Sequence, residues 1–208
     1  MNSNTPITEK FWDLEAALGE VVLERFDEIH GASLALITQE HHFTLGTPGI
    51  AKTMLPDQLV QRISGMKEGD YFSTLLSKST PTEELFGVYD MEMMLKSTYK
   101  RMTEGMLPNA KLATLDEVFK GSAATLNGML TMLNERWFKN HGEERKRPLM
   151  TAFLMSNELA ESETLNALWD RLTLRYHSHP ISDTSNFMRM LTAELDMDPE
   201  PLIDITEI

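Results

Sequence analysis

The chain has 208 residues and a formal net charge of −13, because 32 acidic residues outnumber 19 basic ones. This length fits one large domain, or one domain and a fragment, and a hydrophobic content of 41% can build a buried core. No apolar run approaches the roughly 18 residues of a membrane span, and no secretory signal is visible. The absence of cysteine excludes disulfides, thiol nucleophiles and thiolate metal sites, and the acidic charge opposes non-specific nucleic-acid binding.

The first part of the chain is expected to be mainly helical. Apolar residues spaced by three and four predict an amphipathic helix over 8–29, with Gly31 marking its end. The pair Glu24–Arg25 is expected on a solvated face of this helix. A short helical stretch over 33–40 then leads into a buried strand over 42–45.

The rest of the chain alternates predicted strands and helices. A helix after residue 53 should end near Gly65, and Pro56 is expected to interrupt it, because a proline beyond the first turn removes a backbone hydrogen bond. Strands are predicted at 71–76, 111–115 and 149–155, and helices at 122–136, 165–172 and 184–195, before an acidic end. Residues 91–99 are methionine-rich, and 141–148 form a charged loop. This alternation predicts an α/β fold with a mostly parallel sheet.

A phosphate-binding loop is predicted directly after the first strand. Its residues are, in order, Gly46, Thr47, Pro48, Gly49, Ile50, Ala51, Lys52 and Thr53. They nearly match G-x-x-x-x-G-K-[ST], with alanine before the lysine where the pattern has glycine. Alanine adds one methyl there and is expected to permit a helical first turn. Small residues let backbone N–H groups turn around a phosphate, and the following helix adds its positive end. Lys52 would reach the β- and γ-phosphates, and the Thr53 hydroxyl would bind Mg²⁺.

Polar side chains follow two further strands. Asp116 would hold Mg²⁺ and Glu117 would orient and deprotonate a water, although two acids after a strand are also a common helix cap. Asn157 follows the strand at 149–155 and could bind the γ-phosphate or the water. Ligands bind at the carboxyl ends of parallel strands, so these residues and the phosphate loop are expected to share one site.

Two arginines near residue 172 are candidates for an arginine finger, a side chain that stabilises transition-state charge in a neighbouring subunit. These are Arg171 and Arg175, which flank residues 172–174. The alternative is a surface ion pair with a carboxylate such as Asp170.

Several segments, taken together and in this order, resemble the MoxR-type AAA+ ATPases, and most of all their RavA-type branch. These are GTPGIAKT, TEELFG, the stretch from TEGMLPNAK to LNERWF, MSNELAE and ALWDRLTLR, within a likeness that runs from about residue 20 to 191. The alanine before the lysine in GTPGIAKT is usual in that branch. The resemblance implies a three-layer αβα AAA+ core, with a hairpin inserted before the segment called sensor 1.

The resemblance also implies roles for single residues. Lys52 and Thr53 fall on the Walker A positions, Asp116 and Glu117 on Walker B, Asn157 on sensor 1 and Arg171 on the arginine finger. Thr82 to Gly87 match a family loop, and 137–148 match the inserted hairpin; such loops face the ring pore and contact substrate in related proteins. The implied ligands are ATP and Mg²⁺.

The resemblance further implies a cytoplasmic, ring-forming, usually hexameric chaperone that remodels partner complexes, often with von Willebrand factor A-domain partners. The chain has no counterpart of the helical lid domain that should begin near Ile203. We therefore predict an AAA+ core over 1–181, including the first helix, and a lid stub over 182–208 that consists of a helix and an acidic tail.

Three other functions compete with ATP-driven remodelling. A nucleotide-gated structural subunit with little turnover is favoured by the missing lid and by Pro56, and disfavoured by the intact Glu117. A nucleic-acid motor is disfavoured by the net charge of −13. A small phosphate-loop kinase fits the length but leaves the carboxylates at 116–117 unexplained.

Overall fold

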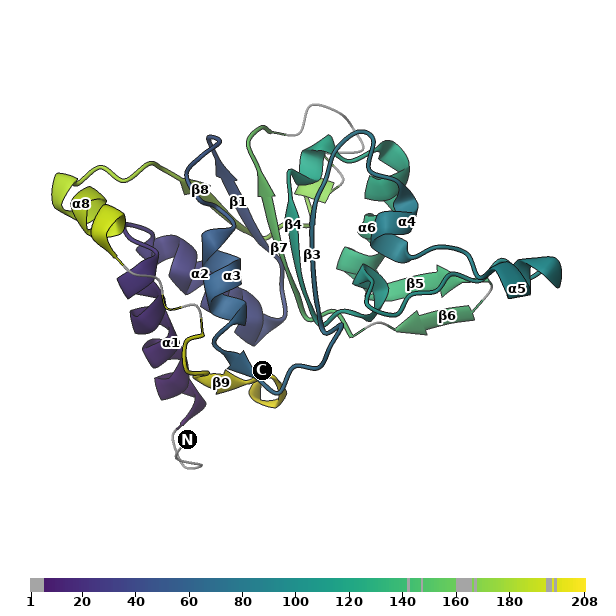
Figure 1. Ribbon diagram of the computed structural model, residues 1–208, viewed down its shortest axis with the longest axis horizontal. Coiled ribbons are helices and arrows are strands. Elements are labelled where there is room, and N and C mark those ends of the chain that lie inside the picture. The colour runs from purple at the N-terminus through teal and green to yellow at the C-terminus, as the bar shows by residue number, and fades with distance from the viewer. Residues whose placement is uncertain are drawn as a thin grey trace.

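A five-stranded parallel sheet with the order β3-β4-β7-β1-β8 forms the centre of the structure (Figure 1). Its strands are β1 (His42–Gly46), β3 (Tyr71–Leu75), β4 (Leu112–Asp116), β7 (Thr151–Ser156) and β8 (Leu174–Ser178). The computed structural model describes residues 6–141, 143–146, 148–159, 166, 168–193, 196 and 198–208. The predicted α/β fold with a mainly parallel sheet is confirmed. Strand β8 was not predicted, because this edge strand lacks an apolar run and only Ser178 of its five residues is buried.

Helices cover both faces of the sheet, which gives three layers (Figure 1). One layer holds α1 (Ile7–Val21), α2 (Phe26–Thr38) and α3 (Met54–Val60), and the other holds α4 (Thr82–Phe86) and α6 (Ala123–Glu135). Each face has its own hydrophobic cluster, with Phe153 in the cluster beneath α1 to α3 and Phe43 in the cluster beneath α4 and α6. Single-turn 3₁₀ helices at Leu107–Asn109 and Val118–Lys120 flank β4.

The predicted helix over 8–29 is wrong in its extent, because one helix ends at Val21 and a second begins at Phe26. Glu24 lies between them in the left-handed region, with φ +60°. Gly31 does not end a helix but lies inside α2, where an added Cβ would stand 2.1 Å from Cζ of Tyr176 on β8. Glycine is therefore needed at residue 31 for the close approach of α2 to β8.

We expect Gly31→Ala to lower the free energy of unfolding by about 1 kcal/mol, since the clash with the Tyr176 ring outweighs the better helix propensity of alanine. In a Tyr176→Ala background the same change should instead stabilise the protein by up to about 1 kcal/mol. Denaturant unfolding of the four proteins measures both effects. A loss of the same size in both backgrounds would contradict the packing explanation.

The helix after the phosphate loop ends at Val60 rather than near Gly65. Pro56 is the third residue of α3, where a backbone N–H has no partner within the helix, so proline does not interrupt it. A short strand, β2 (Ile63–Ser64), follows and pairs in parallel with β9 (Ile203–Asp204) near the end of the chain. The predicted interruption by Pro56 is therefore wrong.

The last residues of the chain pack against the helical layer that contains α1. Ile203 is fully buried and Ile205 is 4% exposed, and both belong to the cluster beneath α1 to α3. A 3₁₀ turn at Ile205–Glu207 follows, in which Glu207 pairs with Lys10 of α1. The helix before this tail is α8 (Thr184–Thr192), and it lies at the opposite end of α1 (Figure 1). The division of the chain at residue 182 stays a prediction.

A projection extends from the side of the molecule opposite α1 (Figure 1). It contains the short helix α5 (Met91–Leu95) and an antiparallel hairpin of β5 (Trp137–Asn140) and β6 (Glu143–Lys146), which precedes β7 as the resemblance implies. Asn140 of β5 joins the hairpin to the segment that follows α5. Its Oδ1 accepts the backbone N–H of Arg101 at 2.7 Å, and its Nδ2 donates to the Arg101 carbonyl at 3.0 Å.

Two histidines at the start of β1 are buried in the core. His41 bonds the carbonyl of Leu133 at 2.7 Å and the N–H of Ala152 at 3.1 Å, whereas His42 stacks on the Tyr176 ring. Burial lowers the pKa of each histidine to about 4, and for His41 the nearby Arg136 adds to this effect. Both rings are therefore neutral in the folded protein at pH 7.

We expect stability to fall as the pH drops from about 6.5 toward 4, because the unfolded chain takes up protons on these histidines and the folded chain does not. The pKa shift to about 4 corresponds to on the order of 3 kcal/mol for each histidine. His42→Phe should remove the contribution of His42 to the pH dependence of the free energy of unfolding, which urea unfolding at pH 7 and pH 5 can measure. An unchanged pH dependence in this variant would show that His42 does not contribute.

Candidate functional site

The phosphate loop follows β1 between the ends of β7 and β8. Leu45 pairs with Ser156 on β7, and Gly46 pairs with Ser178 on β8. A Cβ on Gly46 would meet Cβ of Ser178 at 3.0 Å and its carbonyl oxygen at 3.1 Å, so only glycine fits this crossing. Gly49 has φ +83°, a conformation that glycine adopts readily.

Ala51 departs from the helical first turn that we expected for alanine in the loop. Its φ is +53°, in the left-handed region, where the phosphate-loop pattern has glycine. An L-residue there costs roughly 1–2 kcal/mol. The alanine is thus compatible with the loop, but at a cost in backbone strain.

Asn157 joins the lysine of the loop to the carboxylate that follows β4. Lys52 Nζ donates to Asn157 Oδ1, and Asn157 Nδ2 donates to Glu117 Oε1. Lys52 also donates to the carbonyls of Gly46 at 3.0 Å and Thr47 at 3.3 Å. The structure thus brings together the residues predicted from three separate strand ends.

Glu117 is held tightly at the end of β4. It is 8% exposed, has φ +52° and contacts Lys120 Nζ at 3.3 Å. Desolvation lowers the pKa of Lys52, and the negative charges of Asp116 and Glu117 oppose that shift. The two carboxylates therefore favour the charged form of the lysine, which burial disfavours.

Thr53 and Asp116 are the oxygen ligands predicted for Mg²⁺. Both are partly exposed, Thr53 at the start of α3 and Asp116 at the end of β4. Within the described part of the chain, no group of three or more His, Cys, Asp or Glu residues could hold a metal by itself. A few protein oxygens together with substrate phosphates are the usual Mg²⁺ ligands in nucleotide sites, so this donor set fits that metal.

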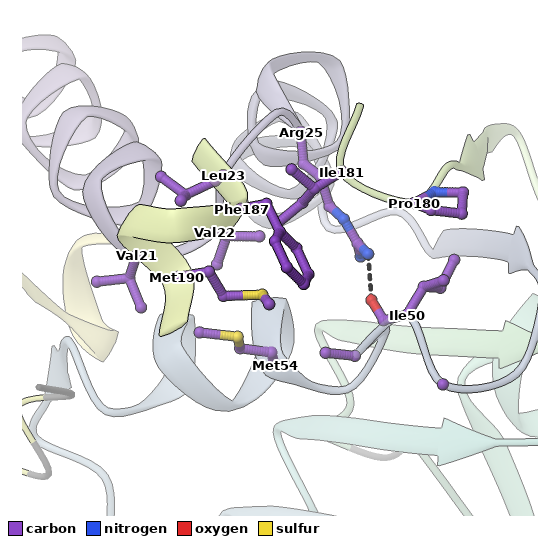
Figure 2. A pocket seen from close by; sticks show the side chains of 12 residues that line it. Val21, Val22, Leu23, Arg25, Ile50, Met54, Pro180, Ile181, Phe187 and Met190 are labelled. Atoms are coloured by element: carbon purple, nitrogen blue, oxygen red, sulfur yellow. Dashed lines mark hydrogen bonds between the residues drawn. The ribbon is translucent and has the colours of Figure 1, made fainter. Parts of the chain in front are cut away.

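The expectation of a solvated face at Glu24–Arg25 is wrong for Arg25, which is 8% exposed. Its Nη2 donates to the carbonyl of Ile50 in the phosphate loop (Figure 2). Glu24 is exposed, yet its carboxylate accepts the N–H groups of Ser182 and Asp183 at 2.8 and 3.0 Å and Asn186 Nδ2 at 3.0 Å. These hydrogen bonds, of which the one from the Ser182 N–H has the largest effect, lower the pKa of Glu24 to about 2. They also tie the start of α8 to the junction between α1 and α2.

An apolar pocket of about 220 Å³ lies beside the phosphate loop. Figure 2 shows Phe187 and Met190 of α8 facing Val22 and Met54 across it. Its other lining residues are Val21, Leu23, Arg25, Gly49, Ile50, Ala51, Pro180 and Ile181. Sequence reasoning missed this pocket; the spacing of three between Phe187 and Met190 was a signal of an apolar helix face, but not of what that face covers.

The two candidate arginines differ in their surroundings. Arg175 Nη2 donates to the Trp169 carbonyl at 2.9 Å, its Nε donates to the Leu172 carbonyl, and its guanidinium lies 4.3 Å above the Trp169 ring. Arg171 is exposed. It precedes β8, whose first residue pairs with His42 at the amino end of β1, so Arg171 and the phosphate loop lie at opposite ends of the sheet. Part of the predicted helix over 165–172 lies outside the described residues.

We expect Ala51→Gly to raise the free energy of unfolding by up to about 1 kcal/mol, because glycine relieves the strain at positive φ while adding entropy to the unfolded chain. The matched control is Ala16→Gly on the exposed face of α1, which should instead lose about 1 kcal/mol. Thermal unfolding of both variants distinguishes the two effects. A loss of stability in Ala51→Gly would contradict the left-handed conformation.

The sequence matches the family described as the MoxR domain in the MoxR-vWA-beta-propeller ternary systems over residues 12–208. Two uncharacterized proteins of Methanocaldococcus jannaschii are 35% and 34% identical to it over 92% and 97% of this chain. A structural protein of Acidianus two-tailed virus is 31% identical over 83% of this chain and 29% of its own length. The chain spans only about half the length of the two M. jannaschii relatives, 50% and 52%.

Solved structures share the fold at low sequence identity. A protein of Cytophaga hutchinsonii, provisionally described as an ATPase, superposes with a TM-score of 0.72 at 17% identity, covering 96% of this chain and 60% of its own. Hsp104 of S. cerevisiae in complex with ADP gives 0.62 at 16% identity, covering 90% and 39%. The predicted AAA+ fold is thereby confirmed, whereas the likeness to the RavA-type branch stays a prediction. The match over residues 12–208, together with the phosphate loop between β1 and α3, places this chain in the MoxR family of AAA+ proteins.

Proposed function

We propose that this chain binds ATP with Mg²⁺ and hydrolyses it in an assembly in which each copy completes its neighbour's site. The observation that carries the proposal is the hydrogen-bonded chain from Lys52 through Asn157 to Glu117. It joins a phosphate-binding cation to a candidate base through one amide, and neither Lys52 nor Glu117 is more than 9% exposed as a whole residue.

The residues of the site divide the chemistry among them. Lys52 exchanges the carbonyls of Gly46 and Thr47 for phosphate oxygens, because both kinds of acceptor suit its ammonium group. Asn157 then orients a water, and Glu117 accepts the water's proton as the water attacks the γ-phosphorus, while the bond from this phosphorus to the bridging oxygen breaks and ADP leaves. Backbone N–H groups of residues 46–53, apart from Pro48, and the start of α3 bind the remaining phosphate charge. Mg²⁺, held by Thr53 and Asp116, would neutralise charge that develops on the phosphates.

The apolar pocket beside the loop is the candidate site for the adenine ring. Gly49, Ile50 and Ala51 belong both to the phosphate loop and to the pocket lining, so a ligand bound to the loop can extend directly into it. Phe187 of α8 offers a ring face for stacking, and Met190 adapts to irregular surfaces. In this interpretation α8 covers one side of the adenine ring (Figure 2).

Arg171 is proposed to act in the site of a neighbouring copy. Its position at the amino end of the sheet separates it from its own phosphate loop by the length of β1, about 13 Å at 3.3 Å per residue. A contribution from a neighbour therefore explains an exposed arginine here better than a contribution to its own site. Arg175 serves within its own chain, because it binds two carbonyls and the Trp169 ring.

The projection is the proposed contact for a partner protein. Met91 and Leu95 are 74% and 89% exposed on α5, and large exposed apolar patches are typical of protein interaction sites. Residues 88–102 and 137–148 together hold seven basic and four acidic residues in a chain whose net charge is −13. The family description supports a partner with a von Willebrand factor A domain. A hexameric ring and a cytoplasmic location are part of the same proposal; no helix in the described residues is long and apolar enough to span a membrane.

A nucleotide-gated structural subunit with little or no turnover is the second candidate. One observation favours it: a relative with 31% identity is named as a structural protein of a virus. In this alternative the assembly binds ATP through Lys52 and the loop, but the bonds of Glu117 to Asn157 and Lys120 keep it from activating water. The two candidates differ in turnover and not in nucleotide binding.

We expect ATP hydrolysis per subunit to rise with protein concentration, as light scattering shows assembly, and to fall at least about 100-fold in Glu117→Gln. Arg171→Ala should be similarly inactive, because an arginine finger contributes about 10³-fold or more. A mixture of these two inactive variants should regain turnover, since Glu117→Gln copies supply Arg171 to sites that retain Glu117. Arg175→Ala is the control and should lower thermal stability more than turnover.

Two outcomes would contradict the proposal. Assembly and tight ATP binding without turnover in the wild type would support the structural subunit instead. Turnover that is independent of concentration, with no recovery in the mixture, would place the arginine's role within a single copy.

A further inference from the structure

A buried cluster of charged and polar side chains lies directly behind the phosphate loop. Arg25 precedes α2, Glu28 follows in its first turn, and Ser178 ends β8. The three residues are 8%, 6% and 2% exposed. Ser178 Oγ donates to Glu28 Oε2 at 2.5 Å, and Arg25 Nη1 stands 3.6 Å from the same oxygen. Removal of one member of such a buried pair leaves an uncompensated charge, which makes the cluster sensitive to small displacements.

Arg25 connects this cluster to the loop. Its Nη2 donates to the carbonyl of Ile50, as the dashed line in Figure 2 marks, whereas its Nη1 is buried and has no hydrogen-bond partner. The 3.6 Å separation from Glu28 is too long for a hydrogen bond. A buried donor without an acceptor is costly, so a shift of the loop that let Nη1 reach Glu28 would be favoured. The guanidinium is thus placed to respond to the position of residues 49–51.

Strand β8 connects the other end of the cluster to Arg171. Ser178 at its carboxyl end pairs with Gly46, and the strand pairs with β1 along its whole length. Three residues before its start lies Arg171, between Leu168 and Leu172, both fully buried in the core. A paired strand and two buried leucines therefore connect Ser178 to the segment that holds Arg171, which gives a displacement at Ser178 a continuous packed path to this segment.

We propose that Arg25, Glu28 and Ser178 form a relay that couples nucleotide occupancy of the phosphate loop to the position of Arg171, and so to turnover in the neighbouring copy. Arg25 is a positioning residue in this relay, because it acts through the Ile50 carbonyl and Glu28. The inference rests on the proposed function, since it requires Arg171 to act in a neighbour.

The test uses the mixture of inactive variants described above, in which turnover occurs only where an Arg171→Ala copy receives Arg171 from a Glu117→Gln copy. Arg25→Met is added to the Glu117→Gln donor alone, so every hydrolysing site keeps its own Arg25. We expect the kcat of the mixture to fall about 5-fold or more, the size of a typical coupling between sites, while the KM for ATP stays unchanged. A change confined to kcat identifies a defect in the supplied arginine rather than in substrate binding.

Two further donors separate the relay from a general loss of structure. Ser178→Ala, also placed on the Glu117→Gln donor, leaves the phosphate-loop contact of Arg25 in place and should lower kcat in the same direction. Arg25→Lys keeps the charge and should recover part of the rate, although a lysine lacks the second arm of the guanidinium. Thermal unfolding and light scattering must show that each donor folds and enters the assembly as the parent donor does.

The outcomes are distinct. If donors with Arg25→Met and Ser178→Ala assemble normally and support the same kcat as the parent donor, the relay is wrong. If the parent mixture itself never recovers turnover, the trans-acting arginine of the proposed function fails first, and the relay fails with it. If Arg25→Met does not assemble, Ser178→Ala alone decides: an unchanged kcat overturns the relay.

Discussion

The position of β1 between two parallel neighbours is the constraint on which the rest of the site depends. The pairing of Leu45 with Ser156 brings the end of β7 to one side of the phosphate loop, and the pairing of Gly46 with Ser178 brings the end of β8 to the other. A shift of one residue in either register would turn every side chain of that strand to the opposite face. The contact between Asn157 and Lys52 follows from this alignment.

The site combines charges that the surrounding core would otherwise penalise. Lys52 and Glu117 are almost fully buried, and Asn157 lies between them as acceptor to one and donor to the other. An amide is suited to this place because it offers both functions within one planar group. In the proposed function, the same arrangement that stabilises the two charges would align a phosphate ligand with the base, so structural stability and the proposed chemistry share the same hydrogen bonds.

The helical layer beneath α8 positions this helix over the pocket beside the phosphate loop (Figure 2). Glu24, in a left-handed turn between α1 and α2, holds the first residues of α8 through four hydrogen bonds. This places Phe187 and Met190 over the loop. The tail beyond α8 then returns to the core, where Ile203 and Ile205 pack beneath α1. The carboxyl-terminal segment therefore has two roles: its last residues pack in the core beneath α1, and α8 covers the pocket.

Much of the sheet and the site could be predicted from the sequence, because their signals are local. Buried strands such as β1, β4 and β7 have apolar runs, and the phosphate loop and residues 116–117 have fixed spacings within a few positions. The edge strand β8 has no such run, since only Ser178 of its five residues is buried. The break at Glu24 and the packing role of Gly31 were hidden, because both depend on contacts with α8 and Tyr176, which are far along the chain.

The sequence by itself determined the family, and it predicted four of the five central strands and the candidate phosphate-binding and carboxylate residues, since these follow from apolar runs and short motifs. Only the tertiary structure decided which groups meet. It placed Asn157 between Lys52 and Glu117, buried Arg25 against Ile50 and Glu28, and put Arg171 at the opposite end of the sheet from the loop. These relations depend on strand register and on packing between segments up to about 150 residues apart, which no local pattern encodes.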